Sequence, residues 1–213
     1  MIVAPLKVAI LSAAGQELFP ACCPEPVDLL HFHDPELFFS AHADLYIDCE
    51  FEPDPVRIKK LSHLLPAAVM VNSVCQTIAE LGQPFTRFNG WTGFSDPQVL
   101  EIALASEDIP VALEQFALAC GRTCIRVPDT VGMVRPRIIA MIINEAWLAL
   151  GEEVSSEHEI DVAMKMGTNY PFGPFEWGEK IGLHRIHRLL SQLSLIDSKY
   201  KPAARLAAAL QTS

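Results

Sequence analysis

The stretch after the first predicted strand most constrains the fold of this chain. The apolar run at Lys7–Leu11 predicts a buried strand, and the residues after it offer one glycine, Gly15, before Pro20, Pro24 and Pro26. A loop that holds a dinucleotide after such a strand carries three spaced glycines, which permit the tight turn, the approach of pyrophosphate and the packing of helix on strand. Internal prolines remove backbone donors and clash with the preceding turn, so we expect the following helix to be cut short.

The alternation of apolar runs with helical segments in residues 1–128 is typical of an α/β protein with a mostly parallel sheet. The pattern predicts strands at 8–11, 27–33, 43–49, 67–72, 85–91, 99–104 and 123–127, and helices at 55–65 and 109–119. Residues 129–213 are helical in character, with helices expected at 134–150, from 156 to 167 and at 181–195, and a turn with exposed aromatic side chains at 171–177. We therefore expect an α/β domain in residues 1–128 followed by an all-α domain in residues 129–213.

Charge and hydropathy exclude several classes of partner. The 213 residues carry a net charge of -10 and include no sizeable basic run, which disfavours nucleic acid because phosphate backbones require clustered Lys and Arg. An acidic surface still permits an anionic small ligand in a local basic pocket. The first residues lack the profile of a signal peptide, and no uninterrupted apolar run reaches the ~18 residues that cross a bilayer. We expect a soluble, cytoplasmic protein without a membrane partner.

Cysteines and histidines offer no clear metal or redox motif. The six cysteines, at 22, 23, 49, 75, 120 and 124, lack the paired spacing of a zinc site and the density of a disulfide scaffold. We expect reduced, mostly buried thiols, with a redox or metal role for Cys22 and Cys23 or for Cys120 and Cys124 as the alternative. His31 and His33 share one face of the second strand, where surface or edge histidines are favoured over a metal site or a replacement base.

Two segments of the second half resemble the C-terminal domain of 3-hydroxyacyl-CoA dehydrogenases. They are Ile160–Gly167 and Tyr170–Glu176, and with Ile143–Ala146 before them and Ile181–Leu183 after them the similarity covers most of residues 129–195. In that family a Rossmann-like NAD domain precedes a helical domain that helps to bind acyl-CoA and forms a dimer. The resemblance thus implies a Rossmann-like sheet, NAD as cofactor, an acyl-CoA-like ligand of fatty-acid metabolism and a homodimer through the C-terminal helical domain.

The resemblance also assigns positions that bind cofactor and substrate. The family places an acid after its second strand to hold the ribose hydroxyls, and Asp34 matches that position, with a turn cap before Pro35 as the alternative. The family's N-T-S-S stretch lies near the substrate. Asn72 and Ser73 match its first two polar positions.

The positions of the family's catalytic dyad depart from its pattern. Members carry R-F-x-G-x-H, in which the histidine takes the hydroxyl proton, and Arg87–Thr92 puts Thr92 at that histidine. Threonine cannot act as a general base near neutral pH. Glu101 matches the glutamate that orients the histidine, and Pro136 replaces the asparagine of a later G-F-x-x-N-R pattern.

These departures suggest a 3-hydroxyacyl-CoA dehydrogenase-like protein whose NAD site and dyad have degenerated, with impaired or lost catalysis. Hydride transfer needs a fixed nicotinamide and a base for the hydroxyl proton, and the sequence alters the residues for both. One alternative is a non-catalytic homodimer that holds an acyl-CoA-like or nucleotide ligand. Another is a structural partner of a fatty-acid enzyme. From the residues alone, enzyme and pseudoenzyme both stay open.

Overall fold

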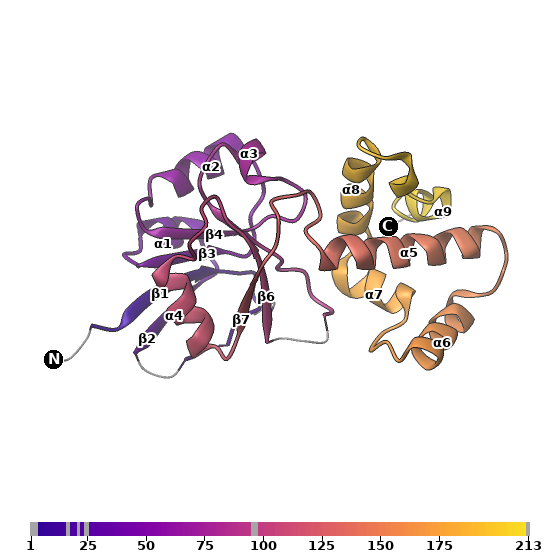
Figure 1. Ribbon diagram of the computed structural model, residues 1–213, viewed down its shortest axis with the longest axis horizontal. Coiled ribbons are helices and arrows are strands. Elements are labelled where there is room, and N and C mark those ends of the chain that lie inside the picture. The colour runs from indigo at the N-terminus through magenta and orange to yellow at the C-terminus, as the bar shows by residue number, and fades with distance from the viewer. Residues whose placement is uncertain (1–3, 16–17, 21, 24–25, 95–97, 212–213) are drawn as a thin grey trace. The chain divides into compact units, whose positions relative to one another are not determined.

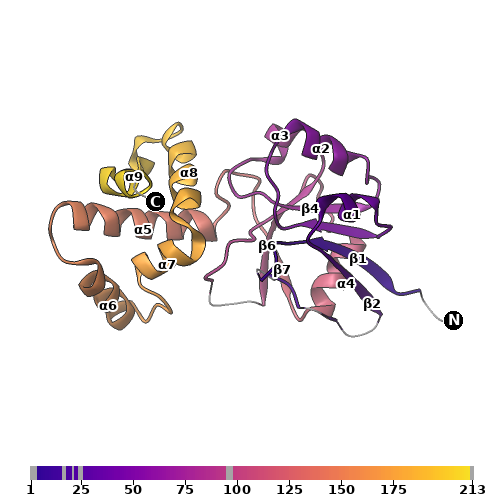
Figure 2. The same ribbon diagram turned by 180° about the vertical axis from the view of Figure 1, so that it is seen from behind.

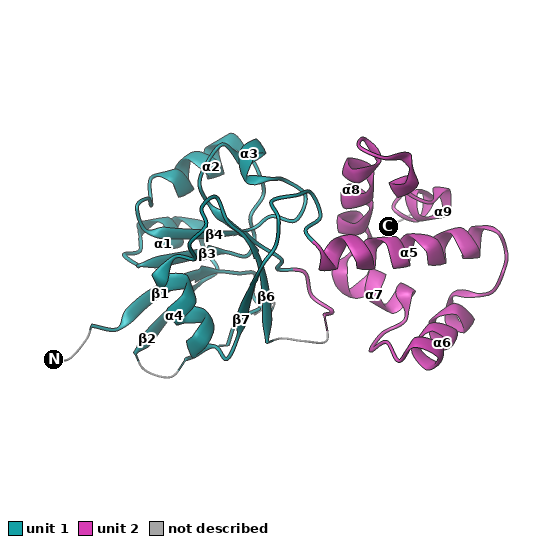
Figure 3. Ribbon diagram, viewed as in Figure 1, with its two compact units in different colours: residues 1–90, 96–133 teal, residues 91–95, 134–213 magenta. Residues whose placement is uncertain are grey.

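The computed structural model describes residues 4–15, 18–20, 22–23, 26–94 and 98–211 (Figures 1 and 2). The chain divides into two compact units (Figure 3). Residues 1–90 and 96–133 form the first, called the sheet unit, and residues 91–95 and 134–213 form the second, called the helical unit. A short segment between two strands of the sheet unit thus belongs to the helical unit.

The sheet unit is built on one seven-stranded sheet in the order β2-β1-β3-β4-β5-β6-β7. Its strands are β1 (Leu6–Leu11), β2 (Val27–Phe32), β3 (Leu45–Asp48), β4 (Ala68–Asn72), β5 (Thr86–Phe88), β6 (Val99–Ala103) and β7 (Thr123–Arg126). The pairings from β2 to β5 are parallel, β6 is antiparallel to β5, and β7 is parallel to β6. The predicted Rossmann-like, mostly parallel sheet is confirmed.

Helices cover both faces of this sheet. They are α1 (Pro35–Ser40), α2 (Pro55–Ser62), α3 (Ile78–Leu81) and α4 (Val111–Ala119). Alternate residues of β1 point to opposite faces, so Val8 and Ile10 join the core under α4, whereas Ala9 and Leu11 join the core under α1 to α3. Figures 1 and 2 show α4 on one side of the sheet and α1 to α3 on the other. Because β1, β3 and β4 run parallel, their carboxyl ends lie at the same end of the sheet.

The connection between β1 and β2 packs into the core. Its described residues form no helix, in agreement with the glycine-poor, proline-rich sequence. The Phe19 ring is 3% exposed and lies 5.1 Å from the Phe116 ring of α4 and 6.0 Å from the Phe88 ring. Arg122 covers the outer side of Phe19, with its guanidinium 4.6 Å from the ring centroid, and donates a hydrogen bond to the Leu18 carbonyl. This connection therefore occupies the face covered by α4.

The helical unit contains α5 (Arg135–Gly151), α6 (Glu157–Thr168), α7 (Pro174–Ile181), α8 (Leu183–Ser194), the 3₁₀ helix η1 (Ser198–Tyr200) and α9 (Ala204–Ala209). The expected turn at 171–177 is wrong in its second half, because α7 begins at Pro174, where a proline is tolerated in the first turn. Phe175 and Trp177 are 7% and 4% exposed instead of solvent-facing. None of the helices in the described part of the chain is long and apolar enough to cross a membrane.

A buried asparagine ties the last helices of this unit to α5. Asn144 is 2% exposed, and its amide donates to the Lys201 carbonyl at 3.1 Å while accepting from the Ala203 amide at 2.8 Å. Both bonds join residues more than fifty positions apart. They replace the water that the asparagine loses on burial and fix the segment between η1 and α9.

Candidate functional site

The segment between β5 and β6 is fastened to α7 by two hydrogen bonds. The Thr92 hydroxyl donates to the Lys180 carbonyl at 2.6 Å, and the Trp177 indole donates to the Gly93 carbonyl at 2.6 Å. Gly93 has φ +91, and an added Cβ would lie 3.2 Å from Trp177 Cδ1, so a glycine suits both the backbone and the contact. The resemblance places Thr92 at the family's base position. Here its hydroxyl donates to a backbone carbonyl and so helps to hold this segment against α7.

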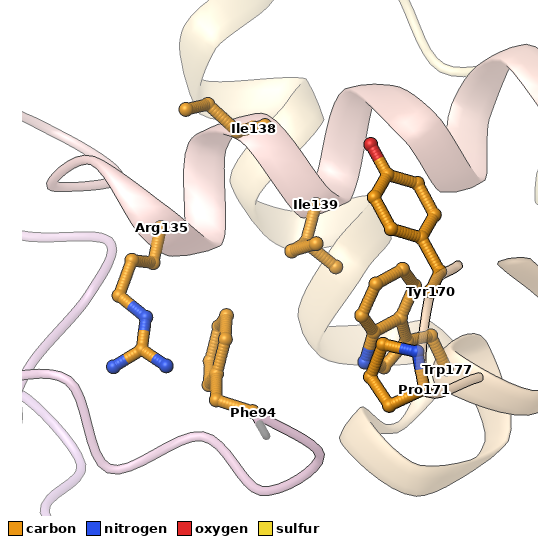
Figure 4. Close-up of a pocket in the computed structure, with 7 residues that line it drawn as sticks. All are labelled: Phe94, Arg135, Ile138, Ile139, Tyr170, Pro171 and Trp177. Carbon is orange, nitrogen blue, oxygen red and sulfur yellow. The ribbon is translucent and has the colours of Figure 1, made fainter. Parts of the chain in front are cut away.

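Beside this segment the helical unit forms a pocket of about 250 Å³. Its walls come from α5, from the loop before α7, from α7 itself and from the 91–94 segment. The lining residues are Phe94, Arg135, Ile138, Ile139, Tyr170, Pro171 and Trp177. Figure 4 shows Phe94 and Arg135 on one side, the group of Tyr170, Pro171 and Trp177 on the other, and Ile139 pointing into the space between them.

Arg135 provides the cation of this otherwise apolar pocket. Its guanidinium carbon lies 4.4 Å from the centroid of the Phe94 ring, an arrangement in which the ring face attracts the charge. A planar guanidinium is a group whose N–H donors match the geometry of a carboxylate or a phosphate. An apolar pocket beside one arginine suits a short acyl group that is attached to a polar or anionic head.

Sequence reasoning did not single out the lining residues as a site. Tyr170, Pro171 and Arg135 lie in segments compared with the family, but no pocket was predicted from them, and Phe94 lies two residues after the threonine at the base position. Arg135 begins α5, directly before Pro136, so the sequence by itself indicated a cation at the start of a long helix. The remaining walls depend on how α5 packs against α7.

Asp161 and Gly173 position the wall that carries Tyr170 and Trp177. The Asp161 carboxylate is 7% exposed and accepts hydrogen bonds from the Phe175 amide at 2.8 Å and the Glu176 amide at 3.1 Å, so it caps the start of α7. An added Cβ at Gly173 would lie 2.2 Å from Asp161 Cγ. Because both residues lie in the segments that resemble the family, that local similarity encodes the start of α7.

In the sheet unit, Asn72 joins the ends of three strands. Its amide donates to the Cys49 carbonyl at 3.0 Å after β3, and its side-chain oxygen accepts from the Gly90 amide at 3.0 Å after β5. An added Cβ at Gly90 would lie 2.6 Å from Asn72 Cγ, so the two residues are in tight contact. Ser73 is 2% exposed, and its hydroxyl lies 3.3 Å from the Gln76 carbonyl. These contacts are within the chain, and the substrate roles of Asn72 and Ser73 stay predictions.

Glu101 is 2% exposed and lies on β6 beside the residue that follows β5. Its carboxylate accepts from the Asn89 amide side chain at 3.3 Å, and its carbonyl accepts from the Asn89 backbone amide at 3.1 Å. Glu101 thus contacts an asparagine of its own sheet unit, whereas Thr92 belongs to the helical unit. The role of the pair as dyad positions stays a prediction.

A buried ion pair lies under the same strands. The Arg87 side chain is fully buried, pairs with Asp129 and donates to the Ser73 carbonyl at 3.0 Å. The Asp129 carboxylate also accepts from the Ile78 amide at 2.9 Å, at the start of α3. Burial lowers the pKa of Arg87, and the bonds to Asp129 oppose that shift. Arg87 was noted only as a motif position, and its partner 42 residues away carried no local signal.

At the carboxyl end of β1 the loop amide faces a carboxylate of the chain itself. The Ala13 amide donates to Glu50 Oε1 at 3.2 Å, and a ring nitrogen of His33 lies 2.8 Å from the Ser12 carbonyl. Asp34 is exposed and accepts from the Glu36 amide at 2.8 Å, which makes it the N-cap of α1. The cap is the alternative role predicted for Asp34, and its ribose role stays a prediction.

The cysteines are less buried than expected. All six are free, but only Cys49 and Cys75 are buried, and Cys22 is exposed. Burial raises the pKa of Cys49, and the carboxylates of its neighbours along the chain add to the shift. Within the described residues no three His, Cys, Asp or Glu side chains form a group that holds a metal ion. His33 is exposed, next to the edge strand β2.

The chain thus combines a unit with a mostly parallel, Rossmann-like sheet and a helical unit that contains an apolar pocket. Its fold matches the crystal structure of (S)-3-hydroxybutyryl-CoA dehydrogenase from Ralstonia eutropha with a TM-score of 0.69 and 23% identity, over 86% of this chain and 70% of that one. That likeness concerns the fold. Comparison of sequences adds a match between the second half of the chain and one protein family.

Residues 132–212 match the family model of the 3-hydroxyacyl-CoA dehydrogenase C-terminal domain. The 3-hydroxyadipyl-CoA dehydrogenase of Escherichia coli (strain K12) is 46% identical over 88 residues, 40% of this chain and 18% of the relative. The 3-hydroxybutyryl-CoA dehydrogenase of Bradyrhizobium diazoefficiens is 29% identical over 184 residues, 78% of this chain and 62% of the relative. These comparisons relate the second half of the chain to the C-terminal domain of 3-hydroxyacyl-CoA dehydrogenases, and the chain spans less than two thirds of each of these two relatives.

Proposed function

We propose that this chain binds the acyl part of an acyl-CoA-like ligand in the pocket of the helical unit and does not catalyse NAD-dependent hydride transfer. The observation that carries the proposal is the hydrogen bond from Thr92 to the Lys180 carbonyl. At the position of the family's base it leaves a hydroxyl that neither accepts a proton near neutral pH nor is oriented toward a reacting group. A hydroxyl substrate would then lack a residue to take its proton.

The first loop does not fit NAD. Pyrophosphate is held by loop amides and by the N-terminus of the following helix. Here the Ala13 amide already donates to the Glu50 carboxylate, and Phe19 and Leu18 pack against the core in the described part of the loop. A pyrophosphate at this loop would have to displace Glu50 or lie beside its negative charge. The dinucleotide therefore has no role in the proposed function.

The pocket supports the acyl part of the proposal. Its apolar walls bury a short hydrocarbon chain, at roughly 25 cal/mol per Å² of apolar surface removed from water. Arg135, stacked on Phe94, puts a positive charge at the pocket, which would attract the thioester carbonyl or a terminal carboxylate. The relatives named above act on 3-hydroxyacyl-CoA compounds, as their names state. By that relationship we place the ligand among the CoA thioesters of fatty-acid metabolism, in the cytoplasm.

We further propose a homodimer through the helical unit. Leu195 and Ile196, adjacent to each other directly after α8, are 86% and 73% exposed. Exposed apolar side chains of this size favour a protein interface when they lie together. Light scattering after size exclusion gives the mass in solution. Leu195→Asp combined with Ile196→Asp would shift a dimer to the monomer mass, and a wild-type monomer would refute this part.

Isothermal titration with two ligand types tests the main proposal. We expect no heat from NADH up to millimolar concentration, no NADH oxidation with acetoacetyl-CoA, and measurable binding of acetoacetyl-CoA. Tight NADH binding together with turnover would overturn the proposal. Binding of NADH without turnover would favour the alternative of a nucleotide-binding regulator. Absence of binding to acetoacetyl-CoA, butyryl-CoA and adipyl-CoA would refute the acyl site.

Two variants locate the acyl site. Ile139→Trp fills the pocket, and we expect the Kd for acetoacetyl-CoA to rise at least about tenfold, the effect of losing roughly 1.4 kcal/mol. Arg135→Ala removes the cation and leaves the apolar walls in place, and we expect a smaller loss. Leu148→Trp on the same helix is the matched control, since Leu148 does not line this pocket. Equal losses in Ile139→Trp and Leu148→Trp would point to a general disturbance of α5 instead of a site.

A further inference from the structure

We infer that Cys23 and Cys120 form a disulfide when the chain meets a peroxide, which locks the connection between β1 and β2 onto the end of α4. The two sulfur atoms lie 3.1 Å apart, in residues 97 positions apart in the sequence. Both belong to the sheet unit and both are half-buried. Because the S–S bond of a disulfide is about 2.05 Å, the sulfurs need to approach by only about 1 Å.

The described residues shortly before Cys23 pack against α4 and the residues that follow it. Phe19, four residues earlier, packs edge-on against Phe116 of α4 at 5.1 Å. Arg122, two residues after Cys120, stacks on the same Phe19 ring and donates to the Leu18 carbonyl. These contacts join residues near Cys23 to residues near Cys120, and the two sulfurs already lie 3.1 Å apart. Such pre-orientation raises the effective concentration of one thiol near the other.

The environment of the two thiols sets the order of reaction. Burial, together with the contact to Cys23, raises the pKa of the Cys120 thiol to about 12, although Arg122 opposes the shift. Cys120 therefore stays protonated near neutral pH and is a poor first nucleophile, because the thiolate is the reactive form. Reaction begins at Cys23.

The chemistry balances with one peroxide. The Cys23 thiolate attacks one oxygen of hydrogen peroxide, the O–O bond breaks, and the product is a sulfenic acid with one water after protonation. The Cys120 sulfur then attacks the Cys23 sulfur and releases a second water, which takes the Cys120 proton. Two thiols lose two electrons and two protons, and one peroxide becomes two waters.

Neighbouring cysteines are less suited to this pair. Cys22 is exposed and adjacent to Cys23 in the chain, and Cys124 lies on β7. The Cys23 sulfur lies 3.1 Å from the Cys120 sulfur, and within the described residues no third ligand completes a metal site. A disulfide between residues 97 positions apart closes a long loop, which strongly restricts the unfolded chain. The crosslink therefore raises thermal stability as well as fixing the loop.

Mass spectrometry of the full chain tests this directly. The reduced protein is treated with hydrogen peroxide, free thiols are alkylated, and the non-reducing tryptic digest is analysed. We expect peptide 8–57, which holds Cys22, Cys23 and Cys49, to be joined to peptide 88–122, which holds Cys120, with loss of two hydrogen atoms. Fragment ions assign the link to Cys23. Both thiols alkylated after peroxide, or a link at Cys22 or Cys49, would overturn the proposal.

Three variants separate the crosslink from general oxidation. Cys22→Ser and Cys124→Ser keep both members of the pair, so each should still form the link and raise Tm on oxidation by about 5 °C or more. Cys120→Ser should lose the link and the oxidation-dependent change in Tm. This comparison is made within each variant, so a lower starting stability of Cys120→Ser does not affect the result. Loss of the link in Cys22→Ser, or an unchanged shift in Cys120→Ser, would refute the assignment.

Discussion

The Asp161 carboxylate lies against Gly173 so closely that an added Cβ at Gly173 would lie 2.2 Å from Asp161 Cγ. The same carboxylate accepts the first free amides of α7, so a helix start and a close packing contact depend on one side chain. The pair lies at the start of α7, which forms part of the wall of the proposed acyl pocket. It also explains why an aspartate on one helix and a glycine before the next appear together in this segment.

Gly173→Ala should destabilise the chain because its methyl group would overlap a carboxylate fixed by two hydrogen bonds. We expect a loss of about 1–3 kcal/mol in the free energy of unfolding, the range of overpacked cores, measured by urea titration. Gly167→Ala on α6 is the matched control, since no atom lies within 4 Å of an added Cβ there. The control should be neutral or gain up to about 1 kcal/mol. Equal effects of the two substitutions would contradict the proposed contact.

Asp129→Asn should destabilise the sheet unit strongly. The substitution leaves the fully buried guanidinium of Arg87 without a counter-charge, and breaking a buried ion pair typically costs about 3–5 kcal/mol. Chemical denaturation measures the loss. Glu36→Gln serves as the control, because its pair with Lys60 is exposed and such pairs contribute under about 1 kcal/mol. If Asp129→Asn cost no more than Glu36→Gln, Arg87 would not depend on this partner.

Thr92→His should not restore dehydrogenase activity. The substitution returns the family's base but leaves the Ala13 amide bonded to Glu50, so the cofactor loop stays unsuited to pyrophosphate. NADH absorbance with acetoacetyl-CoA should show no turnover above that of Thr92→Ser, and circular dichroism checks that both variants fold. Clear turnover in Thr92→His would mean that the loop is competent for NAD and that the residue at this position alone limits catalysis.

Acid should weaken the start of α6 through Glu159. Hydrogen bonds from Ser156 and Ser155 lower the pKa of Glu159 from its ordinary value to about 2. A carboxyl whose folded pKa is depressed stabilises the fold above its unfolded pKa and loses that contribution as pH falls toward the folded pKa. The Tm advantage of wild type over Glu159→Gln should therefore be full at pH 6 and shrink below pH 4.5. An advantage that stays constant down to pH 3 would contradict this prediction.

Local sequence signals predicted most elements well. The capping box at Ser156 and Glu159 marked the start of α6, and the structure contains both of its hydrogen bonds. The apolar run at Lys7–Leu11 predicted a buried strand, and β1 is buried on both faces of the sheet. These features depend on neighbours a few positions away, so periodicity and caps are enough to find them. The start of α7 was missed because its cap, Asp161, lies fourteen residues before Phe175.

The sequence alone determined the α/β character of the first half and the helices of the second. It also contained the segments that resemble 3-hydroxyacyl-CoA dehydrogenases. All of these features depend on residue order over short stretches. Only the tertiary structure decided the partners of the key side chains. The Thr92 hydroxyl meets the Lys180 carbonyl 88 positions away, and the Cys23 sulfur meets Cys120 at a separation of 97. Such pairs form when whole elements pack, since packing fixes which distant groups can exchange water for each other.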